Sequence, residues 1–229
     1  MATNPVSFGV MLLDGYQVLD AIGPIDLIHN ITKSFVSALG ALSSPDIVAK
    51  APDITFHFIS HDMEPVQPTG GPLQLPTCTY ETCPRLDYLL IPGQDPSIPL
   101  APGVAEFLIA KHNEVESILA VCTGSLALAR AGLLEGKTAM TNKIALAVLA
   151  RMGVAPTGVN WEMKGRWSVD GKIWSSAGIT AGMDMTAEWM TTRFDKALVK
   201  WSWDIAEFEP RPKDYSKFDS ILEGVVLPK

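Results

Sequence analysis

A strand-to-helix junction occupies the run Ser117-Ile118-Leu119-Ala120-Val121-Cys122-Thr123-Gly124-Ser125-Leu126-Ala127-Leu128-Ala129. The residues before Cys122 are typical of a strand buried on both faces, and those after Gly124 favour a helix. A sharp turn between the strand and the helix would move the cysteine side chain out of the core and place it at the helix N-terminus. The positive end of the helix dipole there favours thiolate over thiol. The junction therefore predicts a nucleophilic cysteine with a lowered pKa. The alternative is a cysteine that only packs in the core.

Strand-like and helical patterns alternate along the rest of the chain. The strand-like runs are 6–13, 54–60, 88–92, 118–121 and 138–141, and the helical runs are 24–35, 104–113, 123–131, 143–152 and 181–193. Apolar strands separated by helices predict an α/β fold with a doubly wound, mostly parallel sheet and helices on both faces. Asp170-Gly171 between β-formers predicts a hairpin over 167–174.

The length of 229 residues fits one domain, 1–229. Residues 37–53 are longer than an ordinary connection and indicate an insertion, either a surface excursion or a lid. The tail 208–229 contains Glu209-Pro210-Arg211-Pro212, which cannot begin as a regular helix, so we expect an extended arm.

Charge and cysteine content exclude several classes of function. The net charge is −7 and no basic stripe is present, so we expect no nucleic-acid partner. The N-terminal residues carry neither a signal peptide nor a membrane span, and we expect a cytoplasmic protein with no membrane partner. Cys78, Cys83 and Cys122 match no zinc spacing. We interpret Cys78 and Cys83 as bystanders, with a disulfide between them as the less favoured alternative.

Other polar residues follow the predicted strands at the same edge of the sheet as Cys122. Asp20 comes after the first strand, where a carboxyl beside a thiol would have a raised pKa and could move protons; the alternative is that it caps a helix beginning at Pro24. Gly93 and Gln94 follow another strand, and their amides could face negative charge beside the sulfur, unless they form a plain turn. Among the histidines, only His61 ends a strand and could act as a base.

Five motifs together resemble the ThiJ/PfpI superfamily, in the branch that contains isonitrile hydratase. They are Leu19–Pro24, Ile91–Gly93, Val121–Ser125, Ala131–Ala139 and Ala177–Asp184. The resemblance implies a flavodoxin-like sheet with the cysteine on a nucleophile elbow. It implies that Cys122 attacks the isonitrile carbon while Asp20 moves the protons, that Thr123 hydrogen-bonds around the sulfur, and that Gly93 leaves room for the substrate. It also implies a homodimer that acts on a small molecule without a metal or an organic cofactor.

The chain departs from that pattern at three places. Gln94 replaces a glycine of the branch, Asn142-Lys143 replaces a histidine followed by an aromatic residue, and residues 37–53 are extra. Thr123 stands where protease-like and amidotransferase-like members have histidine, which disfavours hydrolysis of peptides or amides. We expect Asn142 and Lys143 to line the pocket rim and to favour a substrate that is more polar than, or shaped differently from, simple aryl or cyclohexyl isonitriles. Two other functions remain open, a glyoxalase-type hydration of a reactive dicarbonyl and a non-catalytic cysteine redox sensor. AraC-type regulators carry similar motifs before a helix-turn-helix module, but only a short tail follows Glu209, which disfavours that function.

Overall fold

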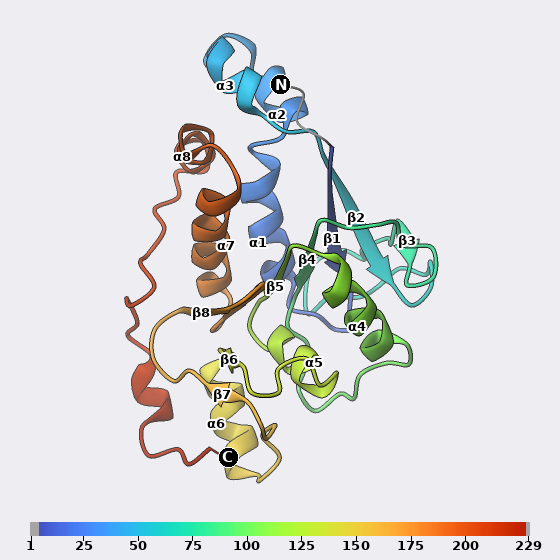
Figure 1. Cartoon of the computed structure of the whole chain (residues 1–229), viewed down its shortest axis with the longest axis vertical. Helices are drawn as coiled ribbons and strands as arrows, with labels where there is room; N and C mark the ends of the chain where they lie inside the picture. Colours follow the sequence, from blue (N-terminus) through green and yellow to red (C-terminus); the bar gives the residue numbers. More distant parts are fainter. Residues whose placement is uncertain (1–4, 228–229) are drawn as a thin grey trace.

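A seven-stranded sheet forms the centre of the computed structural model, which describes residues 5–227 (Figure 1). Its strands, in chain order, are β1 (Val6–Met11), β2 (Ile54–Ser60), β3 (Cys78–Thr79), β4 (Tyr88–Ile91), β5 (Ser117–Ala120), β8 (Trp167–Asp170) and β9 (Ile173–Ser176). The spatial order is β3-β2-β1-β4-β5-β9-β8. Every neighbouring pair is parallel except the hairpin β8/β9. The predicted mostly parallel sheet and the late hairpin are confirmed.

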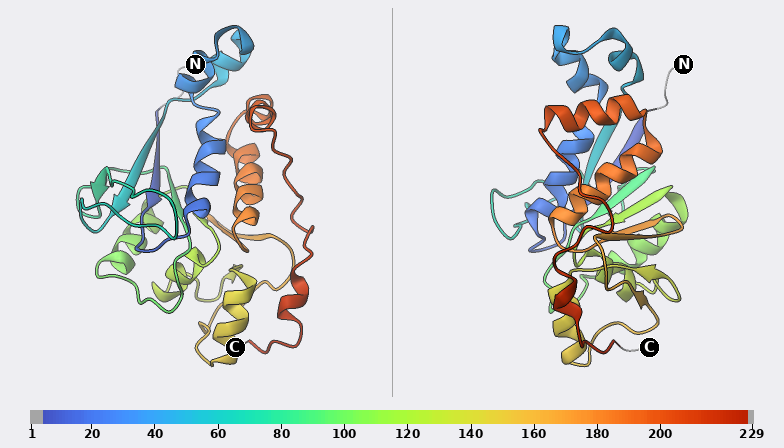
Figure 2. Two further views of the ribbon diagram at one scale, coloured as in Figure 1. Left: turned by 180° about the vertical axis from the view of Figure 1, so that it is seen from behind. Right: turned by 90° about the vertical axis from the view of Figure 1, so that its left-hand side faces the viewer.

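Helices cover both faces of this sheet, as the sequence predicts. They are α1 (Val18–His29), α2 (Lys33–Ala38), α3 (Pro45–Lys50), α4 (Val104–Glu114), α5 (Gly124–Arg130), α6 (Lys143–Arg151), α7 (Thr180–Arg193) and α8 (Lys196–Ile205). Helices α1 and α7 lie on one face, and α4 and α5 lie on the other (Figures 1 and 2). This is the doubly wound, flavodoxin-like arrangement. Because β1 has β2 on one side and β4 on the other, a topological switch point lies between β1 and β4, where such sheets bind ligands beyond the carboxyl ends of the strands.

The first helix begins earlier than predicted. It starts at Val18, not at Pro24, which lies inside it. Proline lacks the N–H that would bond the carbonyl of Asp20, so the local signal favours a later start. Tertiary packing outweighs that loss, because α1 lies so close to α7 that a Cβ on Gly23 would be 2.9 Å from Met183 Cγ.

The predicted strand 138–141 is also different in the structure. Only β6 (Thr138–Ala139) forms, and it pairs with β7 (Asn160–Trp161) in a separate two-stranded sheet. The position beside β5 is taken by β9, whose four side chains are all buried and which pairs with β5 over three residues.

The segment 37–53 lies at the edge of the sheet opposite Cys122. It contains the end of α2, the 3-10 turn η1 (Gly40–Leu42) and α3, and it leads directly into the amino end of β2. Lys33 N donates to Pro52 O at 2.8 Å and closes the excursion at its base. Cys122 instead follows the carboxyl end of β5, so this segment does not cover it (Figure 1). The geometry favours the surface excursion over the lid.

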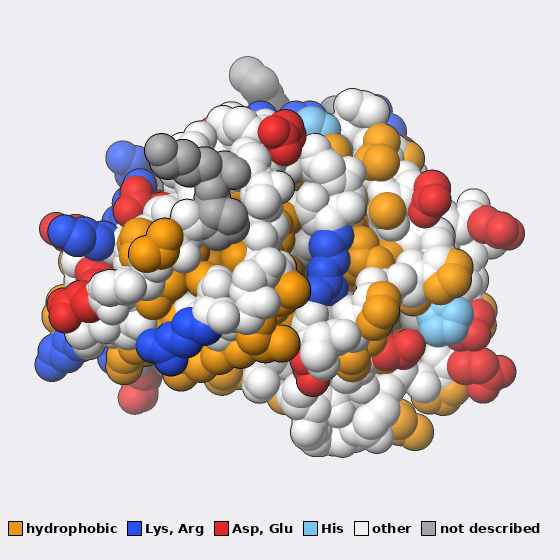
Figure 3. Space-filling view, turned by 90° about the horizontal axis from the view of Figure 1, so that it is seen from below, with side chains coloured by type: hydrophobic (Ala, Val, Ile, Leu, Met, Phe, Trp, Pro, Cys, Tyr) orange, Lys and Arg blue, Asp and Glu red, His pale blue; other side chains and the backbone are white. Residues whose placement is uncertain are grey.

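The C-terminal segment runs from α8 past α7 to the 3-10 turn η2 (Asp219–Leu222), which contacts α6 (Figures 1 and 2). On its outer side α6 exposes Ile144 and Val148, and its C-cap Met152 continues the same face, because the three residues are spaced four apart. Seen from below, hydrophobic side chains gather on the face to which α6 contributes (Figure 3). None of the helices between residues 5 and 227 is long and apolar enough to cross a membrane.

Candidate active site

Cys122 occupies the turn between β5 and α5 in a left-handed backbone conformation, with φ of 58°. Such a φ is uncommon for a residue with a side chain and occurs on sharp strand-to-helix turns that carry nucleophiles. The Cys122 carbonyl accepts hydrogen bonds from Thr141 Oγ1 at 3.0 Å and Ser125 Oγ at 3.3 Å. Gly124 permits the turn, because a Cβ there would overlap the Ile91 carbonyl oxygen. Hydrogen bonds to the Cys122 carbonyl and close packing of Gly124 against Ile91 therefore fix the turn.

Asp20 lies in the first turn of α1 and is completely buried. Its Oδ2 accepts a hydrogen bond from Gly93 N at 3.0 Å, whereas its buried Oδ1 has no partner among residues 5–227. Burial raises the Asp20 pKa to about 7, although the Gly93 hydrogen bond and the neighbouring Cys122 side chain lower it. The N-cap of α1 is Gln17, so the capping alternative for Asp20 is wrong. The carboxyl is held beside the thiol and changes protonation near neutral pH.

The thiol of Cys122 does not have the lowered pKa that the sequence predicts. Burial, followed by the negative charge of Asp20, raises the Cys122 pKa to about 11. Asn142 and the backbone N–H groups of Thr123 and Ile179 stabilise the thiolate and oppose this shift. Burial raises the pKa by more than the helix N-terminus lowers it. A thiolate in a poorly hydrated site loses more stabilisation from water than a few N–H groups provide. Attack by this thiol requires a base that removes its proton.

Asn142 orients a donor at the sulfur. It is the N-cap of α6, and its Oδ1 accepts a hydrogen bond from Ala145 N at 3.1 Å. Since the oxygen is used by the cap, the amide nitrogen faces the other way and Nδ2 donates to Cys122 Sγ at 3.3 Å. The predicted rim position of Asn142 is therefore a direct contact with the thiol.

Lys143 does not line the cavity that contains Cys122, contrary to the expectation. Its Nζ donates to Gly165 O at 2.9 Å and to Met163 O at 3.2 Å, and it pairs with Asp219 Oδ1 at 3.1 Å. A buried ammonium needs such oxygen partners, and these lie behind α6. The amine therefore supports the structure next to the site without entering it.

Gly93 and Gln94 contact the site through their backbones. The N–H of Gly93 is used by Asp20, so it does not face charge beside the sulfur as expected. Thr123 Oγ1 donates to Gln94 O at 2.6 Å, which ties the turn after β4 to the start of α5. The Gln94 side chain points elsewhere, with Nε2 donating to Ile98 O at 3.4 Å.

A cavity of about 220 Å³ opens over these residues. It is lined by Gly15, Gln17, Thr69, Gly93, Gln94, Asp95, Pro96, Cys122, Thr123 and Asn142. A second cavity of about 320 Å³ lies on the other side of Asn142 and is lined by residues that include Ile144, Ile179, Phe218 and Ile221. Both cavities are therefore bounded by the asparagine that contacts the sulfur.

Sequence reasoning missed the contribution of Ile179, whose N–H faces the sulfur. Ile179 precedes α7 a few residues after β9, so the rule that located Asp20 and Gly93 at the carboxyl edge would also have selected it.

His61 pairs with Asp62 at 3.1 Å and does not line the cavity that contains Cys122. Cys78 and Cys83 are free thiols, so the disulfide alternative is wrong. Within residues 5–227, no group of three or more His, Cys, Asp or Glu side chains could hold a metal ion.

We expect Gly93→Ala to lower turnover about tenfold or more, because it displaces the buried Asp20 carboxyl beside Cys122. A Cβ at this position would lie 2.5 Å from Thr123 Oγ1 and 2.9 Å from Asp20 Oδ2, so both groups must move, and small displacements of reacting groups are costly. Steady-state kinetics and thermal unfolding measure the effect. Gly70→Ala is the matched control, since a Cβ there meets no atom within 4 Å. Equal turnover for both variants would contradict the role given to Gly93.

A cysteine on a strand-to-helix turn, beside a buried carboxyl at the switch point of a flavodoxin-like sheet, defines a class of cysteine-centred α/β proteins. The sequence profile of the DJ-1/PfpI family matches residues 9–192. The chain belongs to the DJ-1/PfpI family.

Individual relatives agree with this assignment. Isonitrile hydratase of Pseudomonas putida is 32% identical over 181 residues, which cover 78% of this chain and 68% of that protein. The HTH-type transcriptional regulator GbdR of Pseudomonas aeruginosa is 28% identical over 80% of this chain, but the match covers only 45% of the regulator.

Solved structures have the same fold. A ThiJ/PfpI family protein from Pseudomonas syringae matches with a TM-score of 0.70 and 24% identity, over 92% of this chain and 78% of that one. Drosophila melanogaster DJ-1beta matches with a TM-score of 0.69 and 14% identity, over 91% of this chain and 100% of that one.

Proposed function

We propose that this protein hydrates an isonitrile to an N-substituted formamide, with Cys122 as nucleophile and Asp20 as general acid and base. The observation that carries the proposal is the state of Asp20. Its Oδ1 is buried without a partner among residues 5–227, next to Cys122, and its pKa of about 7 lets it both accept and donate a proton near neutral pH. The 32% identity with isonitrile hydratase supports the choice of substrate class.

The first half of the reaction forms a bond between sulfur and carbon. Because the pKa of Cys122 is raised to about 11, the thiol is protonated at neutral pH, and its proton passes to the ionised Asp20 as Sγ attacks the terminal carbon of the isonitrile. Asp20 then returns the same proton to that carbon. The product is a thioimidate on Cys122, and no proton has entered or left the site.

The second half consumes one water molecule. Asp20, ionised again, removes a proton from water as the oxygen adds to the thioimidate carbon. Asp20 passes this proton to the nitrogen, which gives a tetrahedral adduct that carries a hydroxyl group. The carbon–sulfur bond then breaks as the hydroxyl proton passes through Asp20 to the sulfur, so an N-substituted formamide leaves and the Cys122 thiol is restored. Asn142 Nδ2 and the N–H groups of Thr123 and Ile179 stabilise the negative charge on the leaving sulfur. The chain's own residues thus supply every proton transfer in this sequence.

The raised thiol pKa distinguishes this proposal from the redox sensor. Oxidation of cysteine by peroxide proceeds through the thiolate, which burial disfavours at Cys122. The glyoxalase-type reaction would use the same thiol and carboxyl, so only the substrate separates it from isonitrile hydration.

We expect slow hydration of simple aryl and cyclohexyl isonitriles, with KM raised more than kcat is lowered. The cavity over Cys122 has Thr69, Gln94 and Asp95 in its wall, and contacts to the remote part of a substrate contribute uniform binding. Lys143 does not contribute to this effect, since it is buried elsewhere, so only the replacement of the family's histidine by Asn142 changes a contact next to the sulfur. Steady-state assays with a panel of aryl, cyclohexyl and hydroxyalkyl isonitriles measure the preference.

Methylglyoxal serves as the competing substrate in the same assays. Lactate formed steadily from methylglyoxal, with no formamide from any isonitrile, would transfer the function to the dicarbonyl reaction. Activity on neither compound class would contradict both enzymatic functions. The homodimer and the cytoplasmic location implied earlier stay predictions, and light scattering tests the first of them.

A further inference from the structure

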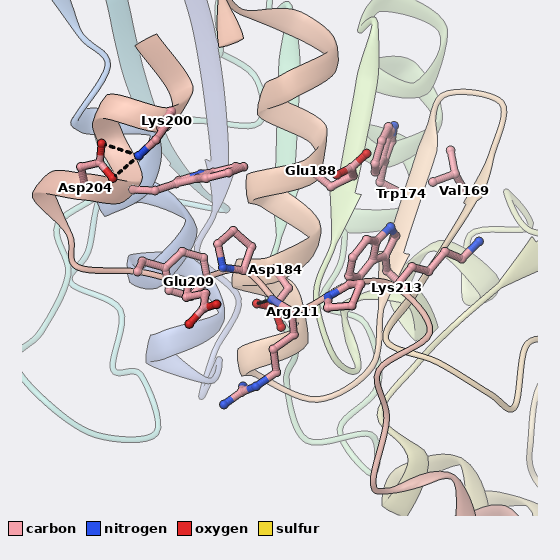
Figure 4. A pocket seen from close by; sticks show the side chains of 14 residues that line it. Val169, Trp174, Asp184, Glu188, Lys200, Asp204, Glu209, Arg211 and Lys213 are labelled. Carbon is pink, nitrogen blue, oxygen red and sulfur yellow. Dashed lines mark hydrogen bonds and ion pairs between the residues drawn. The ribbon is translucent and has the colours of Figure 1, made fainter. Parts of the chain in front are cut away.

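A larger cavity lies away from Cys122, between α7, α8, the hairpin β8/β9 and the segment that follows α8 (Figure 4). Its volume is about 860 Å³, and it shares no lining residue with the cavity over Cys122. The proposed chemistry makes no use of it. The segment after α8 closes one side, because Phe208 N bonds back to Trp203 O at 2.9 Å and the chain then crosses α7.

Aromatic rings form the walls of this cavity. Trp167 and Val169 are two residues apart in β8, and Val169 is directly opposite Trp174 of β9, so the three side chains share one face of the hairpin. Trp203 of α8 and Phe208 stand across from them. Three of the six tryptophans of the chain therefore line one cavity. Trp203 Nε1 is buried and has no hydrogen-bond partner among residues 5–227.

Most charges at the cavity are already paired. Asp184 binds Arg166 Nε at 2.6 Å and Arg211 N at 2.9 Å. Lys200 Nζ lies 2.6 Å from Asp204 Oδ1, and the two neutralise each other. The guanidinium of Arg211 lies 6.0 Å from the centre of the Tyr215 ring, and Figure 4 shows it turned away from the cavity.

Glu188 is an exposed carboxylate in the wall of the cavity. It projects from α7 toward Trp174, and it has no ion pair among the described residues (Figure 4). Lys213 extends outward beneath Val169 from the exposed C-terminal segment, and Glu209 contributes a second carboxylate at the rim. The cavity wall therefore combines aromatic rings, whose faces carry negative electrostatic potential, with an exposed carboxylate that has no ion pair among the described residues.

We propose that this cavity binds an organic cation with apolar substituents, such as an alkylated ammonium. The cationic group lies between the Trp174 and Trp203 rings and the Glu188 carboxylate, and the apolar groups lie against Trp167 and Phe208. The faces of aromatic rings attract an alkylated ammonium, and its alkyl groups keep water away from the charge, so it loses little hydration on binding. A small metal ion would lose much more hydration, and an anion would be repelled by the ring faces. The site is independent of the hydration reaction at Cys122.

Titration calorimetry with benzyltrimethylammonium tests this inference, with benzyl alcohol and phenylacetate as neutral and anionic comparisons. We expect the cation to bind at least about tenfold more tightly than either comparison, and more weakly as salt is added. Glu188→Gln should weaken binding of the cation about three- to tenfold without changing binding of the alcohol. Trp203→Leu should weaken it by a similar factor.

Glu106→Gln is the matched control, because Glu106 is also an exposed helical glutamate but belongs to α4 on the other face of the sheet. Its affinity should equal that of the unchanged protein, and thermal unfolding verifies that each variant is folded. Tighter binding of phenylacetate, or a folded Glu188→Gln protein that keeps full affinity for the cation, would overturn the proposal. So would the absence of binding at about 10 mM of the cation, a concentration near the weakest expected affinity.

Discussion

Replacement of Cys122 by alanine is expected to lower turnover by about four to six orders of magnitude, because no other group near Asp20 can form the thioimidate. The fold should survive. Alanine meets the same backbone cost at φ 58° as cysteine does, and the turn is held by hydrogen bonds to the backbone carbonyl that remain. Steady-state kinetics measure the loss, and near-UV circular dichroism verifies the fold.

Cys83→Ala is the control for loss of a thiol as such, since Cys83 lies outside the cavity over Cys122. A Cys122→Ala protein with undiminished turnover would end the assignment of the nucleophile. Alkylation of Cys122 by iodoacetamide adds a check on its protonation. Because burial raises the pKa to about 11, its rate should continue to increase with pH far above neutrality, with no plateau near neutral pH.

Replacement of Asp20 by asparagine is expected to lower turnover by about two to four orders of magnitude, the usual contribution of general acid–base catalysis. Asparagine keeps the shape and the acceptor for Gly93 N but cannot take the thiol proton. In the unchanged protein, kcat/KM should rise with pH through about 7 as Asp20 ionises. The variant should lack this acidic limb, and a pH profile measured with the best isonitrile tests both statements.

The same substitution should stabilise the protein at alkaline pH. The folded pKa of Asp20, about 7, lies above the ordinary value of 3.8, so the folded state holds a proton that the unfolded chain has lost between these values. The stability contributed by that proton is complete below about pH 4 and is lost as pH rises through about 7, a difference of up to about 4 kcal/mol.

An amide at this position does not ionise and has no such loss, so the midpoint of thermal unfolding of Asp20→Asn should exceed that of the unchanged protein at about pH 8 and not at about pH 4. A variant that melts earlier at the alkaline pH and turns over normally would contradict both the catalytic role and the burial argument. Asp20 would then serve only to hold Gly93 in place.

The sequence predicted those parts of the fold that local patterns determine. The run around Cys122 combined a buried strand, a small residue at the turn and helix formers, and all three agreed with the final structure. The rule that functional groups follow the carboxyl ends of parallel strands brought Asp20, Gly93 and Cys122 to one place, although they are far apart in the chain. These predictions succeeded because each depended on a short segment or on topology alone.

Predictions that depended on neighbours distant in the sequence were less successful. The pKa of Cys122 is set by the water removed around it and by the charge of Asp20, neither of which the junction itself contains. Lys143 follows Asn142 directly, but its ammonium is drawn to Gly165 and Asp219 in the second half of the chain. The start of α1 was misplaced because packing against α7 overrides Pro24. The pKa of Cys122, the position of the Lys143 ammonium and the start of α1 each depend on contacts with residues distant in the sequence, which a local pattern does not contain.

The segment 37–53 lies far enough from Cys122 that a change in its length leaves the residues around the thiol in place. Residues 37–53 lie at the amino edge of the sheet, and the base of the excursion is fastened by the bond between Lys33 N and Pro52 O. Doubling a closed loop costs only about 0.6 kcal/mol. This region can therefore change in length, or accept a fluorescent reporter fused at Gly40, without a change in the residues around Cys122.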